Sequence, residues 1–381
     1  NTVLSIVQDR KGFIWLATGS GLDRYDGLHF KQYLYDKNDS GSIENNYVIS
    51  LLCDRNGNMW IRTTSGLQIY NESKDNFSHI RIPAQRSQSK IISTLCEDNA
   101  GNIWIGTFDG LFFINEKNIK KCVAYPYMNR LAGTNVRSIF QDKTSNLWIG
   151  TATGLTKICT VNGRQQFETF HYDAKNPFSI QGNFITSLAE TQDGKILIGT
   201  QDNGVCEYLP ENGRFKHLAG ISPDEHIRKI FVKSNDDLWI GTQDGLLNYS
   251  LKDKKATKYT HNILMPNSLS QNSVYSIFQD NCGSLWIGTY FGGINVLNNY
   301  DTPFFDFASY YHVSNTLFND MISGMTEDKN GNLWIGTEGG GLHKVNLQNG
   351  TAATFVNNLS DSESLGSNNV KIVYADDDGN I

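Results

Sequence analysis

Apolar and polar positions follow one another in a fixed order that returns about every 45 residues along the chain. Each unit opens with an apolar run such as Val274–Asp280, passes a polar turn, and continues through a second apolar run such as Leu285–Thr289. A Gly-Leu pair and a weaker aromatic stretch complete the unit, as in residues 21–25 and 30–33. Short runs bounded by Asp, Asn and Gly are typical of β-strands joined by tight turns. The pattern therefore predicts four short strands per unit and an all-β chain.

Tryptophan marks the second run of nearly every unit. The anchors are Trp15, Trp60, Trp104, Trp148, Trp239, Trp286 and Trp334, with Leu197 where one is missing. Successive anchors lie 45, 44, 44, 49, 42, 47 and 48 residues apart. A period of this size, with four strands per unit, is typical of β-propeller blades. In that fold we expect each tryptophan to fill the space between neighbouring blades.

Two kinds of residue recur around the anchors. An aspartate stands six residues before most of them, at Asp9, Asp54, Asp98, Asp142, Asp280 and Asp328. A glycine often stands three before, and a threonine stands three after in all eight units. Asp accepts local backbone hydrogen bonds and Gly takes positive φ, so the pair predicts a hairpin turn. Because these residues recur, we expect them to form the scaffold, and we look for function where the blades differ.

Composition and charge narrow the class of protein. The chain has 381 residues, of which 39% are hydrophobic and 19% charged, with a formal net charge of −6. An acidic chain with scattered Lys and Arg argues against a nucleic-acid partner. No run of about 18 apolar residues is present to span a bilayer. The six cysteines lack metal-binding spacing, so we expect mainly buried hydrophobes and assign neither a metal nor a cofactor.

The unit also resembles a known repeat. Residues 328–341 (DKNGNLWIGTEGGG) and 9–26 (DRKGFIWLATGSGLDRYD) are similar to the two-component-regulator propeller repeat. The resemblance covers nearly the whole chain and implies the periplasmic sensor ectodomain of a Bacteroidetes hybrid two-component system. Such ectodomains typically contain two seven-bladed propellers and a β-sandwich. A membrane helix, a histidine kinase and a response-regulator output follow them.

The resemblance implies a function as well. Such sensors detect oligosaccharides released from polysaccharides and switch on the genes that use them. On this basis we expect a non-enzymatic, periplasmic domain of a receptor anchored in the inner membrane. Its expected partners are an oligosaccharide, its own second propeller and the downstream β-sandwich. A homodimer of the receptor is a further contact compatible with this architecture.

Two domain organisations fit the repeat count. We favour a first propeller of seven units over residues 1–308 and an incomplete second propeller over residues 309–381. Pro303 and a dense aromatic cluster after the seventh unit favour this break. The alternative is a single eight-bladed ring. Because the chain starts directly in the first strand of a unit, we expect a closing strand for the seven-bladed ring to lie upstream of Asn1.

The residues that break the repeat gather on one face of the predicted ring. The first strand should line the axis, and its start shares a face with the loop between strands two and three, since successive strands alternate in direction. Aromatic rings stack on sugar faces, while arginines pair with hydroxyl or acid groups. Arg62 also stands where most units have glycine. We therefore expect a ligand to contact Arg62, Arg137, Arg228, Tyr275, Tyr290 and Phe291.

Two other functions remain open. Some lyases use propellers with similar blades, and they need a His or Tyr base beside a carboxylate or metal. Of the eight histidines only His226 falls at the start of a first strand, and no G-x-S-x-G, P-loop or HExxH motif occurs. We therefore assign no catalytic residue. A propeller scaffold for protein–protein contacts in surface assembly or export is the main alternative to a sensor.

Overall fold

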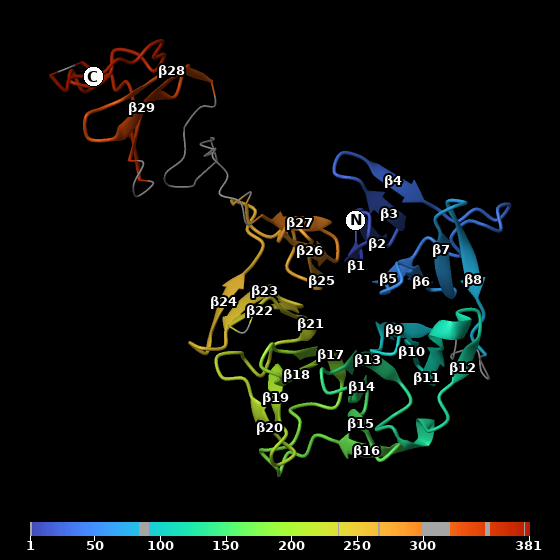
Figure 1. Cartoon of the computed structure of the whole chain (residues 1–381). Coiled ribbons are helices and arrows are strands. Elements are labelled where there is room, and N and C mark those ends of the chain that lie inside the picture. The colour runs from blue at the N-terminus through green and yellow to red at the C-terminus, as the bar shows by residue number, and fades with distance from the viewer. Residues whose placement is uncertain are drawn as a thin grey trace. The chain divides into compact units, whose positions relative to one another are not determined.

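The structure is a computed structural model that describes residues 2–83, 91–234, 236–265, 267–298, 321–346, 351–376 and 378–381. These residues form eight antiparallel sheets, seven of four strands and one of three (Figure 1). Within each sheet, strands that are consecutive in the chain are neighbours. The prediction of an all-β chain built from four-stranded propeller blades is therefore confirmed.

The strands of each blade are numbered in chain order. The first strands are β1 (Val3–Gln8), β5 (Val48–Cys53), β9 (Ile92–Glu97), β13 (Val136–Gln141), β17 (Ile185–Glu190), β21 (Ile227–Val232), β25 (Val274–Gln279) and β28 (Ile322–Glu327). The second strands are β2 (Ile14–Thr18), β6 (Met59–Thr63), β10 (Ile103–Thr107), β14 (Leu147–Thr151), β18 (Ile196–Thr200), β22 (Asp237–Thr242), β26 (Leu285–Thr289) and β29 (Asn332–Thr337).

The outer strands complete the blades. The third strands are β3 (Gly21–Tyr25), β7 (Leu67–Asn71), β11 (Gly110–Ile114), β15 (Leu155–Val161), β19 (Val205–Leu209), β23 (Leu246–Ser250), β27 (Ile294–Leu297) and β30 (Gly341–Asn346). The fourth strands are β4 (Phe30–Tyr33), β8 (Asn76–Ile80), β12 (Cys122–Ala124), β16 (Arg164–Phe170), β20 (Arg214–His217), β24 (Lys255–Tyr259) and β31 (Ala352–Phe355). Two short 3₁₀ turns are η2 (Glu116–Asn118) and η3 (Met128–Arg130).

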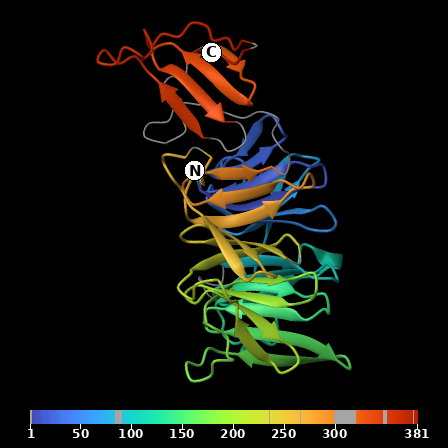
Figure 2. The ribbon, with the colours of Figure 1, turned by 90° about the vertical axis from the view of Figure 1, so that its left-hand side faces the viewer.

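Seven of the sheets stack face to face in one compact unit, residues 1–261 with 267–299 (Figure 2). In this unit β1 packs against β5 on one side and against β25 and β26 on the other. The Asn281 backbone N–H donates to Gln8 Oε1 at 2.9 Å across that junction. Val3 and Ile6 share a buried cluster with Trp286 there. The first and seventh sheets are therefore neighbours, and the seven sheets close a ring.

The eighth sheet, β28 to β31, belongs to the second compact unit, residues 262–266 with 300–381. Its small core holds Ile335 and Val345. The boundary predicted between residues 308 and 309, with Pro303 beside it, lies outside the described residues. The second propeller and the closing strand upstream of Asn1 stay predictions.

Each anchor tryptophan of the first unit packs against the next blade. Trp148 on β14 is 1% exposed and shares a buried cluster with Ile185, Ile198 and Tyr208 of the following sheet. The rings of Trp148 and Tyr208 meet edge-on, with centroids 5.0 Å apart. Trp15 packs in the same way against the second blade. The predicted role of tryptophan between the blades is confirmed.

The recurring aspartate ties the hairpin turn to this anchor. In six blades its Oδ2 accepts a hydrogen bond from the tryptophan Nε1 at 2.7–2.9 Å, in the pairs Asp9–Trp15, Asp54–Trp60, Asp98–Trp104, Asp142–Trp148, Asp280–Trp286 and Asp328–Trp334. Its Oδ1 accepts backbone N–H groups of the turn, as Asp142 does from Asn146 at 2.8 Å. One carboxylate thus satisfies both the turn and a buried indole N–H.

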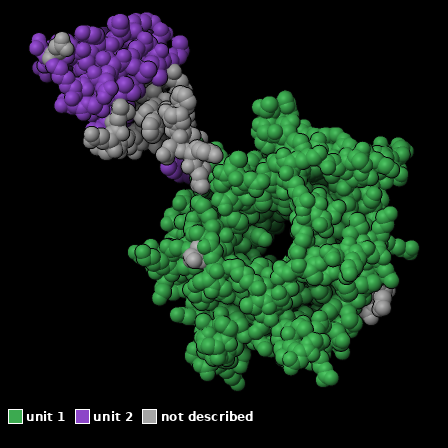
Figure 3. Space-filling model, in the orientation of Figure 1, with its two compact units in different colours: residues 1–261, 267–299 green, residues 262–266, 300–381 purple. Residues whose placement is uncertain are grey.

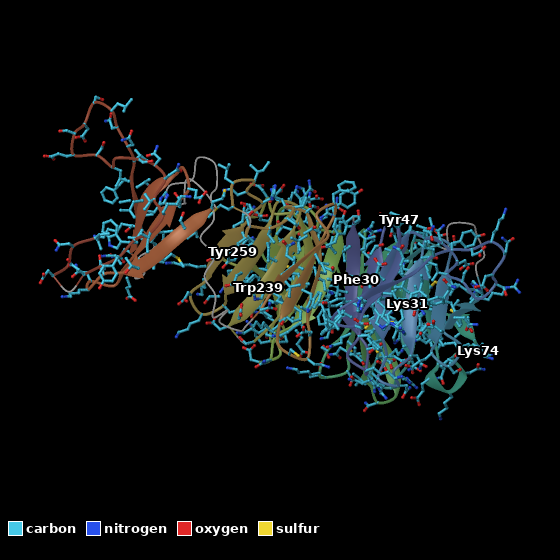
Figure 4. All side chains as sticks on the ribbon, turned by 90° about the horizontal axis from the view of Figure 1, so that it is seen from above. Phe30, Lys31, Tyr47, Lys74, Trp239 and Tyr259 are labelled. Carbon is cyan, nitrogen blue, oxygen red and sulfur yellow. The ribbon has the colours of Figure 1, made fainter. Side chains whose placement is uncertain are left out.

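Two blades lack this bond for different reasons. In the fifth blade both partners are replaced, by Thr191 and Leu197, so no indole N–H is left without an acceptor. In the sixth blade Lys233 replaces the aspartate while Trp239 is kept, and its Nε1 is buried without a hydrogen-bond partner. The Trp239 ring still stacks on Tyr259 at 5.9 Å (Figure 4).

Replacing Lys233 by Asn is expected to raise the free energy of unfolding by about 1 kcal/mol, because the Asn Oδ1 would accept the orphaned indole N–H. Asn is preferred to Asp because Asp236 and Asp237 would repel a further carboxylate. The measurement is urea unfolding followed by circular dichroism. The matched control is Thr191→Asn in the fifth blade. The anchor there is Leu197, which has no N–H to donate, so the free energy of unfolding should not rise. Equal effects of the two substitutions would contradict the explanation.

Three connections in the first unit share a local structure that fixes where first strands begin. A residue at the start of each loop donates its backbone N–H to an Asn side chain eleven residues later, in the pairs Tyr35–Asn46, Tyr172–Asn183 and His261–Asn272. An apolar residue in each loop is buried, at Ile43, Ile180 and Leu269. These loops anchor the starts of β5, β17 and β25, on the face that carries the predicted site.

Candidate functional site

A channel runs through the first unit, and the first strands of its blades line it (Figure 3). The cavity has a volume of about 920 Å³. The prediction that the first strand is innermost is therefore confirmed. The residues near the starts of these strands surround one mouth of the channel, and Tyr47, just before β5, lies at that face (Figure 4).

A β-bulge in every first strand of this unit decides which side chains line the mouth. The pairing between first and second strands skips one residue, the second of each first strand: Leu4, Ile49, Ser93, Arg137, Thr186, Arg228 and Tyr275. All seven line the channel. A bulge re-aims the extra residue away from the regular pleat. Each blade of the unit therefore contributes one variable bulge position to the channel lining.

Arg137 lies close to two aromatic rings. Its guanidinium carbon lies 5.2 Å from the ring centroid of Phe108 in the loop after β10, and 4.9 Å from that of Phe184 just before β17. Burial lowers the pKa of Arg137 below its usual range. Rings that cover the faces of a guanidinium fix its plane and leave its N–H edge for hydrogen bonds.

Arg228 begins a second aromatic group. Its guanidinium carbon lies 4.1 Å from the ring centroid of Tyr275, and that ring stacks on Tyr290 at 5.4 Å. Phe291 meets Tyr290 edge-on at 4.2 Å but is 68% exposed and does not line the channel. Burial raises the pKa of Tyr47, and the neighbouring Tyr290 and Tyr275 raise it further. These tyrosines therefore share one stretch of the mouth.

Arg62 occupies a position that is tightly packed in other blades. A Cβ at the equivalent Gly106 would lie 2.7 Å from side-chain atoms of Thr94 and Val136. Arg62 itself is 6% exposed, lines the channel and donates from Nη1 to the Ser93 carbonyl at 3.1 Å. Its Nε is buried without a hydrogen-bond partner. Burial, followed by repulsion from Arg137, lowers its pKa to about 9.

Lys229 is a fourth cation in the channel. This residue was not predicted from the sequence as part of the site. It follows the bulge residue of β21, where the other six first strands of the unit have Ser or Thr. The side chain reaches water, yet the protein around the channel desolvates its amine and lowers its pKa. The signal was present in the sequence as the one departure from Ser or Thr at this position.

The channel lining is cationic in a chain that is acidic overall. Among the described residues, the charged residues that line it are Arg62, Arg137, Arg228, Lys229 and Glu190. None of the four cations forms an ion pair within the described part of the chain. Toward the other end the lining becomes apolar, with Phe140, Phe231 and Phe278. The arrangement can hold a molecule with a polar, anionic end.

The structure thus brings five of the six predicted site residues into one channel and leaves Phe291 at its edge. It adds Tyr47, Phe108 and Lys229 to them. His226 also lies at this face, with its Nδ1 3.4 Å from Asp202 Oδ1, and both side chains are partly exposed. In the described residues, no helix has the length and apolar character needed to cross a membrane.

Comparison with known proteins gives a consistent result. The family model described as two component regulator propeller matches residues 1–20, 42–65, 87–109, 130–153, 179–202, 268–291 and 316–339. The extracellular domain of a putative hybrid two component system from B. thetaiotaomicron is 27% identical, with a TM-score of 0.75. That match covers 100% of this chain and 49% of the other chain.

Two further matches are more limited. Histidine kinase P4 of Formosa agariphila is 33% identical over 94 residues, which is 22% of this chain and 7% of that protein. Virginiamycin B lyase from Staphylococcus aureus is 11% identical with a TM-score of 0.58, over 77% of this chain and 93% of the lyase. At that identity the likeness shows the fold alone. This chain spans about half of the B. thetaiotaomicron domain and a small part of the kinase.

Proposed function

Since the chain carries repeats of the two component regulator propeller family between residues 1 and 339, we propose that it is the ligand-sensing extracellular domain of a two-component sensor. The ligand we propose is an oligosaccharide derived from a polysaccharide, which would control genes for glycan use. The parent receptor would be anchored in the inner membrane, place this domain in the periplasm and carry a histidine kinase elsewhere. The likeness to an extracellular domain of a hybrid two component system supports this role.

The observation that carries the proposal is the group of arginine and aromatic side chains at one channel mouth. Tyr275 and Tyr290 present stacked rings, and Arg137 and Arg228 hold guanidinium groups against aromatic faces. Sugar rings offer apolar faces to aromatic side chains and hydroxyl groups to planar donors. The bulges hold Arg137, Arg228 and Tyr275 on strands of a closed ring. A rigid site of this kind loses little entropy when a ligand binds.

We place the remaining partners in the same receptor. The second compact unit begins another propeller in this proposal, and the β-sandwich would follow it. Binding at the first propeller would then change contacts with these domains or between two copies of the receptor. A scaffold for protein–protein contacts stays the alternative function.

Titration calorimetry and thermal unfolding with a broad panel of oligosaccharides test the proposal. A ligand at about 100 times its Kd stabilises the folded state by about 2.7 kcal/mol, which corresponds to a rise in Tm of roughly 5 °C. We expect Tyr290→Ala to weaken binding of the responding sugar about tenfold. The matched control is Tyr374→Ala, at an exposed tyrosine of the second unit. A chain that binds no sugar in the panel would favour the scaffold.

One observation supports a lyase as a second candidate. His226 and Asp202 form a partly exposed pair just before β21 and in the loop after β18, and an imidazole oriented by a carboxylate could act as a general base. Incubation with the same oligosaccharides, followed by mass spectrometry for cleaved products, separates the two candidates. Cleavage that is lost in His226→Asn would replace the sensor proposal with the enzyme.

A further inference from the structure

The inside of the channel carries an excess of positive charge. Three guanidinium groups and one amine line it, against a single lining carboxylate at Glu190, in a chain with a formal net charge of −6. The Glu190 carboxylate already accepts the Lys143 backbone N–H at 2.9 Å. Cations gathered in a walled space repel one another, and nearby groups of opposite charge would relieve that repulsion.

Arg62 is a buried cation of the channel. The residue is 6% exposed, uses Nη1 on the Ser93 carbonyl, and leaves Nε without a partner. Most other blades have glycine at this position. A buried cation without a counter-ion destabilises a fold by several kcal/mol. A residue that breaks the repeat at such a position therefore points to a bound group of opposite charge.

Phe108 and Phe184 both lie against the Arg137 guanidinium, and rings packed there restrict its movement while its N–H groups can still donate to a ligand. Arg228 and Lys229 are consecutive, and the bulge brings both into the channel. A planar guanidinium edge fits the oxygens of a carboxylate or a sulfate, with two parallel hydrogen bonds. The mouth thus combines an anion site with the tyrosine rings that suit a sugar.

We infer that the channel of the first unit recognises an anionic oligosaccharide, with its carboxylate or sulfate group held by Arg62, Arg137 and Arg228. Lys229, the next residue along the strand, adds a fourth positive charge to the same channel. The sugar ring that carries the charge stacks on Tyr275 and Tyr290. This inference rests on the proposed function and adds the class of ligand. A neutral sugar would leave the four cations without a counter-ion.

The repeat supplies variants that the fold already accepts. Arg62→Gly, Arg137→Ser, Arg228→Thr and Lys229→Ser each introduce a residue that another blade has at the same position. The control is Arg164→Ser, on the exposed outer strand β16 of the same blade as Arg137. A Tm of each ligand-free variant equal to or above that of the unmodified chain shows that the blades remain intact.

The probes for calorimetry are short oligosaccharides of hexuronic acids, the same sugars with their carboxyl groups reduced to alcohols, and sulfated oligosaccharides. Sodium acetate and sodium sulfate are titrated separately. We expect at least one acidic sugar to bind. If that sugar is a hexuronic acid oligosaccharide, its carboxyl-reduced form should not bind. The combined Arg62, Arg137 and Arg228 variant should weaken binding by about 10- to 100-fold, while Arg164→Ser leaves it unchanged. Comparison of the hexuronic acid and sulfated oligosaccharides shows whether the channel recognises a carboxylate or a sulfate group.

Three results would overturn the inference. A neutral sugar that binds equally well to the unmodified chain and to the arginine variants would keep the proposed function and remove the anion site. Acetate or sulfate that binds as tightly as every acidic sugar would leave an ion site without sugar recognition. Failure of all sugars, neutral and acidic, would instead remove the proposed function itself.

Discussion

Truncation of Trp148 to alanine is expected to lower the free energy of unfolding by about 3–5 kcal/mol, the range found for large buried aromatic residues. The side chain is 1% exposed and packs on Ile185, Ile198 and Tyr208 of the next blade. Its removal would open a cavity between two sheets and leave the carboxylate of Asp142 without its indole partner. Urea unfolding monitored by tryptophan fluorescence and circular dichroism gives the measurement.

The fifth blade supplies the control for this prediction. It replaces the pair by Thr191 and Leu197, and Leu197 is fully buried. Trp148→Leu combined with Asp142→Thr should therefore cost less than the sum of the two single changes, because neither partner is left unsatisfied. Strict additivity would show that the aspartate–tryptophan bond contributes nothing beyond packing.

Replacement of Asp142 by alanine should lower the free energy of unfolding by about 2–3 kcal/mol, since it leaves a buried indole N–H and turn donors unsatisfied. The carboxylate accepts hydrogen bonds from Trp148 Nε1 at 2.8 Å, Asn146 Nδ2 at 2.9 Å and Thr144 Oγ1 at 2.8 Å. The variant is compared by urea unfolding with Asp224→Ala, at an exposed loop carboxylate.

The same carboxylate makes stability depend on pH. Burial alone would raise the pKa of Asp142, but hydrogen bonds from Trp148, Asn146 and Thr144 outweigh it and hold the pKa below the ordinary 3.8. The folded state then binds fewer protons than the unfolded chain, so this contribution is present above pH 3.8 and is lost as the pH falls below that value. Asp142→Ala should lower Tm less at acidic pH than at pH 7. A constant difference would contradict the assignment.

Much of the fold followed from the sequence because each blade repeats the same local signals. The tryptophan spacing counted the blades, and Gly-Leu and the Asp-Gly turn placed strands such as β3 and β26 at their observed bounds. The burial of Trp148 against the next sheet also followed from blade geometry. Eight copies of one pattern reinforce one another, so weak single-strand signals became a firm prediction.

The site was less predictable because it depends on register. Alternation of side chains could not reveal that Arg137 and Arg228 occupy bulges, since the pairing of β13 with β14 is a tertiary property. Lys229 was missed for the same reason: without the bulge, two consecutive residues would face opposite sides. The burial of Arg62 also depends on the neighbouring blade.

The bulge of each first strand has a consequence for how such domains diversify. The bulge residue lines the channel without taking part in the pairing ladder, which the residues on either side of it form. A substitution at one of these positions can change what enters the channel while the hydrophobic core stays as it was. Duplicated genes could thus acquire new specificities one amino acid at a time. A combinatorial library randomised at the seven bulge positions would sample that diversity in the laboratory on a single stable backbone.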